Sequence, residues 1–222
     1  MDKNTQGIIY MQEGKFEEAA TLFNEVIEQN PIDAVGYINF GNLLMHMKDF
    51  EHAERFFNRA IELDGNAATA YYGLGNLYFE QSLYQPAQQN FQKAMELGLE
   101  ESDVYYMLGI TLQNQEQFKL SLPYLLRAAE LAPGDDEVLF LYGLSLAQAN
   151  HLKDAKSTFE NVIGMNPEHS DAHYNLGIIS IYDENIDEAL AHFNEALRIQ
   201  PEHILAANGK KNIQALLKEN DR

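Results

Sequence analysis

Two stretches of the chain, GNLLMHMKDFEHAERFFNRA at residues 41–60 and GNLYFEQSLYQPAQQNFQKA at residues 75–94, lie 34 residues apart and share a pattern of residues. Both begin with Gly-Asn-Leu, and both carry Ala, Phe and Ala at the same later positions. The same spacing places a glycine in six segments: Gly7, Gly41, Gly75, Gly109, Gly143 and Gly177. A fixed period of this length, with no insertion, predicts a repeat protein rather than an ordinary globular domain.

Each repeat contains the pattern of two helices. Twelve residues after each glycine lies a small residue, mostly Ala. Phe or Leu follows four residues later, and Ala or Val lies three residues after that. Spacings of four and seven place these residues on one face of a helix, called helix B. The glycine lies on an apolar face of an earlier helix, called helix A. Because glycine inside a helix is unfavourable by about 0.5–1 kcal/mol relative to alanine, we expect it to permit close packing of helix B.

This pattern of Gly, Ala, Phe and, at four repeat ends, proline resembles the tetratricopeptide repeat (TPR), including small stand-alone bacterial members of that family. The resemblance implies an all-α fold: a right-handed α-solenoid of six TPR helix-turn-helix repeats plus a C-terminal capping helix. The expected repeats are about 1–33, 34–67, 68–101, 102–135, 136–169 and 170–202. Residues 203–222 are expected to form the capping helix, with its lysines on a solvated face.

The fourth repeat departs most from the pattern. Leu99 stands before it in place of a helix-ending proline, Ser121 replaces alanine, and Leu125 replaces phenylalanine. Pro123 lies near the start of its second helix, where it removes a backbone donor unless it falls in the first turn. A local irregularity is therefore expected there.

Composition excludes several classes of protein. The net charge is −19, with a local +2 in residues 203–222, so a phosphate backbone is a poor partner and no nucleic acid is expected. The chain has no cysteine, which excludes disulfides and thiol chemistry. No apolar run reaches the length that a bilayer requires, and no signal peptide is recognisable, so we expect a cytoplasmic location without membrane contact.

In TPR proteins the A helices line a concave groove that holds partner peptides, and the resemblance implies the same surface here. The groove residues expected to bind a peptide are Asn39, Asn42, Met45, Tyr72, Asn76, Phe79, Tyr106, Met107, Phe140, Leu141, Tyr174 and Asn175. None of the groove positions holds Lys or Arg, which argues against the clamp that binds C-terminal carboxylates in some relatives. Apolar side chains with an acidic rim (Glu80, Asp103, Glu137 and Asp171) favour a protein or peptide partner with apolar anchors and a basic flank.

Alternatives remain for these residues and for the function. The aromatic side chains could pack between neighbouring helices, and the asparagines could form hydrogen bonds between repeats. His169 and His173 have a spacing that can hold a metal, yet one lies in a turn and the other fills an aromatic position, so no metal is expected. We also expect no cofactor and no enzyme activity. The function predicted is a protein–protein interaction adaptor or scaffold. The alternatives are a self-associating structural module and a non-catalytic regulatory subunit of an enzyme.

Overall fold

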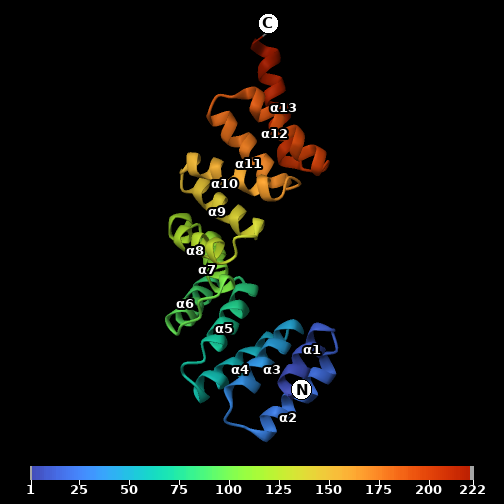
Figure 1. Ribbon diagram of the computed structural model, residues 1–222, viewed down its shortest axis with the longest axis vertical. Helices are drawn as coiled ribbons and strands as arrows, with labels where there is room; N and C mark the ends of the chain where they lie inside the picture. Colours follow the sequence, from blue (N-terminus) through green and yellow to red (C-terminus); the bar gives the residue numbers. More distant parts are fainter. Residues whose placement is uncertain (1, 221–222) are drawn as a thin grey trace. The chain divides into compact units, whose positions relative to one another are not determined.

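The computed structural model describes residues 2–220, and in this range the chain forms thirteen α-helices and no strand (Figure 1). The helices are α1 (Lys3–Gln12), α2 (Phe16–Gln29), α3 (Ala34–His46), α4 (Phe50–Leu63), α5 (Ala68–Glu80), α6 (Tyr84–Glu96), α7 (Ser102–Asn114), α8 (Phe118–Leu131), α9 (Asp136–Gln148), α10 (Leu152–Met165), α11 (Ser170–Tyr182), α12 (Ile186–Ile199) and α13 (Ile204–Asn220). The all-α prediction is confirmed, with helices of 10 to 17 residues.

The chain divides into two compact units. Unit 1 is Met1–Glu116, which contains α1 to α7, and unit 2 is Gln117–Arg222, which contains α8 to α13. The division falls between α7 and α8, inside the fourth of the expected repeats. Within each unit, helices that follow one another in sequence pack together, as α3 does with α4 and α11 with α12.

A left-handed residue ends helix A in every repeat. Gly14, Lys48, Ser82, Glu116, Asn150 and Glu184 all have φ between 58° and 73°, and they are spaced by 34 residues. In the turn after α3, the Lys48 N–H donates to the Met45 carbonyl at 2.9 Å and the Asp49 N–H donates to the Leu44 carbonyl at 2.9 Å. These bonds satisfy the last carbonyls of the helix, as in a Schellman motif. Only the first repeat uses glycine for this conformation.

Five of the six repeat glycines face the phenylalanine of helix B, and the fourth repeat has Leu125 at that position. A Cβ atom on Gly41 would lie 2.7 Å from Phe57 Cε1, and one on Gly143 would lie 2.7 Å from Phe159 Cε1. Both rings are fully buried. Since carbon atoms in good contact are about 3.5–4.0 Å apart, any side chain at these glycines would overlap the ring. The expectation of a close seam between helices A and B is confirmed, and the ring itself occupies the seam.

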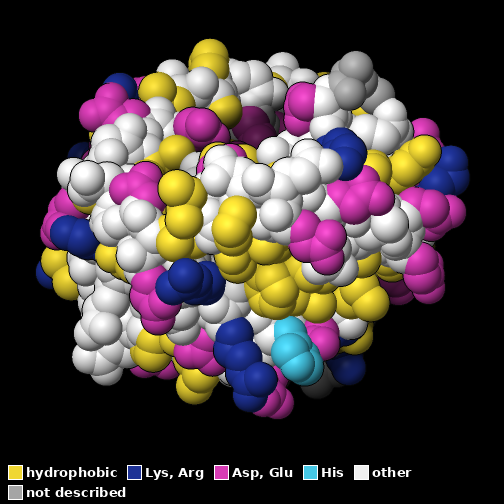
Figure 2. Space-filling view, turned by 90° about the horizontal axis from the view of Figure 1, so that it is seen from below, with side chains coloured by type: hydrophobic (Ala, Val, Ile, Leu, Met, Phe, Trp, Pro, Cys, Tyr) yellow, Lys and Arg dark blue, Asp and Glu magenta, His cyan; other side chains and the backbone are white. Residues whose placement is uncertain are grey.

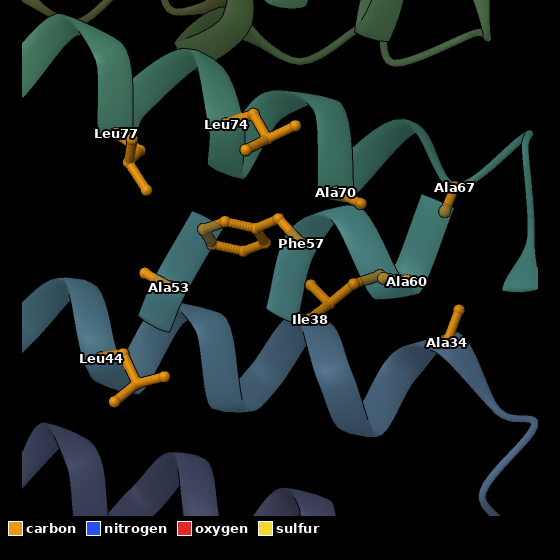
Figure 3. Packing of buried hydrophobic residues seen from close by; sticks show 10 residues of the cluster. All are labelled: Ala34, Ile38, Leu44, Ala53, Phe57, Ala60, Ala67, Ala70, Leu74 and Leu77. Carbon is orange, nitrogen blue, oxygen red and sulfur yellow. The ribbon is translucent and has the colours of Figure 1, made fainter. Parts of the chain in front are cut away.

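The same ring also touches the next helix A. A Cβ atom on Gly73 of α5 would overlap Phe57 of α4, and one on Gly209 of α13 would lie 2.8 Å from Cζ of Phe193 of α12. Figure 3 shows Phe57 among the buried side chains that fill the space between α3, α4 and α5. A single phenylalanine therefore joins its own repeat to the next one.

The expected irregularity at Pro123 is not a break in the helix. α8 is continuous from Phe118 to Leu131, with Pro123 inside it, past the first turn. Both Pro123 and Lys119, whose carbonyl loses its partner, are exposed, so water can satisfy that carbonyl. At Ser121 the hydroxyl forms a buried 2.6 Å hydrogen bond with the Ser145 hydroxyl of α9, which explains a serine at a position that otherwise holds alanine.

An irregularity lies instead at the end of α6, where Leu99 replaces the proline. Here Gly98 adopts φ +92°, and the Leu99 N–H donates to the Ala94 carbonyl at 3.1 Å. The corresponding residues after α2 and α4, Asn30 and Asp64, have φ near −140°. Without a proline to end the helix, the chain uses the left-handed conformation that glycine permits.

The last helix caps the chain but is not polar all round. Ala206 and Ile213 of α13 are buried in the cluster around Phe193, so α13 covers α12 as expected. Its remaining large apolar side chains are exposed: Ile204 (73%), Leu205 (56%), Leu216 (61%) and Leu217 (43%). α13 therefore caps the repeats through Ala206 and Ile213, while four large apolar side chains of the same helix have no partner helix among the described residues.

Candidate functional site

Unit 1 contains a hollow of about 610 Å³ between its A helices. We call it the methionine hollow. Its lining residues are Met11 of α1; Asn42, Met45 and His46 of α3; Lys48 and Phe50 of the turn and the start of α4; Tyr72, Gly73, Asn76 and Glu80 of α5; and Met107 of α7. Three thioethers from three helices meet there with two amide side chains. Methionine has three rotatable bonds, so such a surface adapts its shape to an apolar group.

Five of the twelve predicted groove residues line the methionine hollow: Asn42, Met45, Tyr72, Asn76 and Met107. Sequence reasoning missed Met11, Lys48, Phe50 and Gly73. Met11 could have been found, since it precedes Met45 by one repeat period. Lys48 and Phe50 lie in and after the turn, outside the helix A positions that the family pattern marks. Lys48 gives the hollow a positive group that was not anticipated.

Asn76 is the least satisfied polar residue of the hollow. Its Oδ1 atom is buried and accepts no hydrogen bond. Every other buried side-chain N or O atom of the described residues has a hydrogen-bond partner. A buried acceptor without a donor is unfavourable by about 1–3 kcal/mol. Burial raises the pKa of the neighbouring Tyr72 phenol, while a hydrogen bond from Asn76 lowers it. The Asn76 side chain is thus engaged through its amide nitrogen, while its Oδ1 has no donor among the described residues.

Two other predicted asparagines are used inside the protein. Asn39 Nδ2 of α3 donates to Asn4 Oδ1 of α1 at 3.0 Å, a bond between neighbouring repeats. Asn175 Nδ2 donates to the Asp171 carbonyl of its own helix at 2.8 Å. The alternative of hydrogen bonds between repeats therefore describes Asn39, whereas the bond of Asn175 lies within its own helix.

Several predicted aromatics pack against other rings. Phe140 is 7% exposed, and its ring centroid lies 5.6 Å from that of Phe159 and 4.4 Å from that of His169. Phe140 is therefore a core residue, which corrects its place in the predicted groove. Tyr174 lies 5.9 Å from Phe193 and 5.2 Å from His203, and Phe79 lies 5.7 Å from Tyr84. Tyr106 and Leu141 are partly buried.

The histidines serve as helix caps and packing groups. His169 Nδ1 accepts the Ala172 N–H at 3.2 Å, and His203 Nδ1 accepts the Ala206 N–H at 3.2 Å. His173 lies 3.2 Å from His192 between Nδ1 atoms and donates from Nε2 to the Pro167 carbonyl at 3.3 Å. In the second repeat Tyr37 makes the equivalent bond to Pro31. No cluster of three or more His, Asp or Glu side chains suited to a metal occurs among residues 2–217.

The acidic rim is partly engaged by these caps. Asp171 Oδ1 lies 3.0 Å from His203 Nε2, and Glu137 Oε2 lies 3.8 Å from His169 Nε2. Glu80, by contrast, is exposed at the hollow and forms no ion pair within the part of the chain that the structure describes. Figure 2 shows Asp and Glu side chains over much of the displayed face, together with an area of hydrophobic side chains. In the described range, no helix is both long enough and apolar enough to span a membrane.

Known proteins share both the sequence pattern and the fold. Models of the tetratricopeptide repeat match residues 4–33, 32–100, 106–155 and 143–204. The crystal structure of YrrB, described as a TPR protein with an unusual peptide-binding site, is 46% identical to this chain. That match covers 85% of this chain and 97% of the other, with a TM-score of 0.81. The TPR repeat-containing protein YrrB of Bacillus subtilis is 51% identical over 39 residues. This sequence match covers 18% of this chain and about a fifth (19%) of that protein's length.

More distant structures share the fold alone. The pilF protein of Pseudomonas aeruginosa is 18% identical, with a TM-score of 0.78, over 96% of this chain and 95% of that one. MamA from Desulfovibrio magneticus is 23% identical, with a TM-score of 0.71, over 77% of this chain and 96% of that one. The repeated glycine–phenylalanine seam, the paired helices and the close match to YrrB lead to one conclusion. This chain belongs to the tetratricopeptide repeat family and is of the YrrB type.

Proposed function

We propose that this protein is an interaction adaptor that binds a partner segment in the methionine hollow. TPR proteins serve in general as protein-interaction modules, and the YrrB structure is described as having a peptide-binding site. The observation that carries the proposal is the buried, unpartnered Asn76 Oδ1 beside Met45 and Met107. A peptide N–H satisfies that acceptor, while an apolar side chain of the same segment fills the space between the thioethers.

The ligand differs from a C-terminal carboxylate held by a cationic clamp. The hollow has one lysine, Lys48, and the carboxylate of Glu80 on its surface offsets that charge. Unit 1 as a whole has 6 Lys and Arg against 18 Asp and Glu, a net charge of −12. A segment with an apolar anchor and a basic neighbour is therefore favoured over an acidic tail. We further propose that the protein acts in the cytoplasm, as a non-catalytic subunit or scaffold.

The test uses the full chain as bait in a cell extract, followed by mapping of the bound segment. Asn76→Ala should weaken binding of that segment by about 5- to 30-fold, equivalent to about 1–2 kcal/mol. The matched control is Asn175→Ala, since Asn175 is engaged within its own helix and lies in unit 2. If Asn76→Ala binds the mapped segment as tightly as the wild type, the hollow is not the binding site.

A stability measurement separates binding from folding. Asn76→Ala removes both an unfavourable buried oxygen and the hydrogen bond to Tyr72, so the two effects offset and the free energy of unfolding should change little. A polar residue that matters for binding but not for stability is the expected signature of a site. A marked loss of stability would instead assign Asn76 a structural role.

A further inference from the structure

The apolar stripe of α13 continues beyond the part of the helix that is packed. Ile213 is 3% exposed and packs in the cluster with Phe193, whereas Leu216 and Leu217 are 61% and 43% exposed. Residues three and four positions apart share a helix face, so these leucines extend the face that Ile213 begins. In the described residues, no helix follows α13 to cover them. The C-terminal turns thus present an apolar anchor on a short helical segment.

This segment has the chemistry that the methionine hollow favours. The anchor is a pair of leucines, which suits a flexible thioether lining. Lys211 is exposed on the same helix, and residues 203–222 carry a net charge of +2 against −12 for unit 1. A basic segment meeting an acidic body is attracted from a distance, at a rate that falls with added salt. With this segment bound in the hollow, Lys211 would lie opposite the exposed carboxylate of Glu80.

We propose that the methionine hollow of one copy binds the C-terminal turns of α13 from a second copy of this chain. The proposal rests on the proposed function, because it names a partner for the same hollow. Leu216 and Leu217 enter between Met45 and Met107, and the exposed amide of Gln214 lies within the same segment as a donor for Asn76. The donated surface and the accepting surface differ, so the contact is heterologous. An open assembly keeps one free tail at one end and one free hollow at the other, so it continues beyond a dimer or closes into a ring.

The first experiment measures self-association of the full chain by sedimentation over a range from micromolar to millimolar concentration. The wild type should associate beyond a dimer, and Leu216→Ser combined with Leu217→Ser should remain monomeric at every concentration. Both leucines are exposed, so these changes leave the fold intact, which circular dichroism checks. A wild type that stays monomeric, or a double variant that associates equally, overturns the proposal.

The second experiment identifies the accepting surface. Met107→Gln, in the hollow, should weaken association at least tenfold, while Met165→Gln, a 43% exposed methionine of α10, should have no effect. If the leucine variant dissociates the assembly but Met107→Gln does not, the tails pair with one another and the hollow is not their partner. That result overturns the proposal.

Binding of a labelled peptide of residues 204–222 tests whether the hollow binds this tail or only another partner segment. The peptide should bind the full-length Leu216→Ser/Leu217→Ser protein saturably, and Asn76→Ala in that protein should weaken the binding. A peptide that does not bind overturns the tail as ligand. If the segment mapped from cell extract still requires Asn76 in that case, the proposed function stands without this partner.

Discussion

Replacing Gly143 by alanine tests the seam between the two helices of a repeat. The new Cβ atom would lie 2.7 Å from Cε1 and 3.0 Å from Cδ1 of Phe159, a ring that is fully buried. Separations of about 3.5–4.0 Å are needed, so the ring or the helix must move by nearly an ångström. Overpacking of this kind destabilises by about 1–3 kcal/mol. The better helix propensity of alanine offsets about 0.5–1 kcal/mol of that. We expect a net loss of about 1–2 kcal/mol.

Gly164 supplies the matched control within the same unit. It lies in α10 and is exposed, and a Cβ atom there would meet nothing within 4 Å. Gly164→Ala should therefore raise the free energy of unfolding by about 0.5 kcal/mol through propensity alone. Urea unfolding followed by circular dichroism measures both variants in the same unit-2 transition. The two substitutions are chemically identical, so only the ring explains opposite signs.

The refuting result is a Gly143→Ala variant as stable as the wild type. A double-mutant cycle locates the cause: Phe159→Leu frees space at the seam, so Gly143→Ala should be less harmful in that background. A coupling energy of about 0.5–3 kcal/mol is expected for residues in contact. Additive effects would mean that Gly143 is required for some reason other than the ring.

Three further outcomes are expected. Ser82→Gly and Glu184→Gly should each stabilise by about 0.5–1 kcal/mol in urea unfolding, since both residues hold a left-handed conformation that is unfavourable for residues with a Cβ atom; Asn150→Gly is the control with the smallest gain. Burial, and to a smaller extent the charge of His173, lowers the pKa of His192. The free energy of unfolding should therefore fall as pH drops below the ordinary value of 6.5, because the unfolded chain binds the proton first. His192→Gln should reduce this dependence of stability on pH. Burial and a 2.6 Å bond to Glu54 raise the pKa of Tyr78 to about 12, so stability should fall above pH 10, where the unfolded phenol ionises first, and less so in Glu54→Gln.

The repeat architecture could be predicted from sequence because its determinants are residue types at fixed spacing. Glycine, alanine and phenylalanine mark the seam in almost every copy, and each has a steric reason to be there. The left-handed turn residues could not be predicted in the same way. Lys48, Ser82 and Glu184 have no preference for that conformation, and the packing of helix B over helix A imposes it.

The groove was only partly predictable, for two physical reasons. Asn39 and Asn76 both come from predicted groove positions of helix A, yet one bonds to Asn4 and the other has an unpartnered oxygen. The difference depends on which side chain of the preceding repeat lies opposite each asparagine. Phe140 and Tyr72 share a repeat position, but the ring of His169 covers Phe140, whereas the residue that corresponds to His169 next to Tyr72 is Glu101. Neighbours one repeat away decide whether an aromatic is core or surface.

The position of Phe57 and of Phe193 between two glycines bears on how such a chain can lengthen or shorten in evolution. Phe57 requires Gly41 before it and Gly73 after it, and Phe193 requires Gly177 and Gly209. Duplication or loss of 34 consecutive residues keeps the distance of 16 residues from each ring to the facing positions of both A helices, while a change of another length breaks it. Phe193 packs against Gly209 of α13, so a further 34-residue copy inserted upstream of α13 leaves that ring its partner in the helix that follows it.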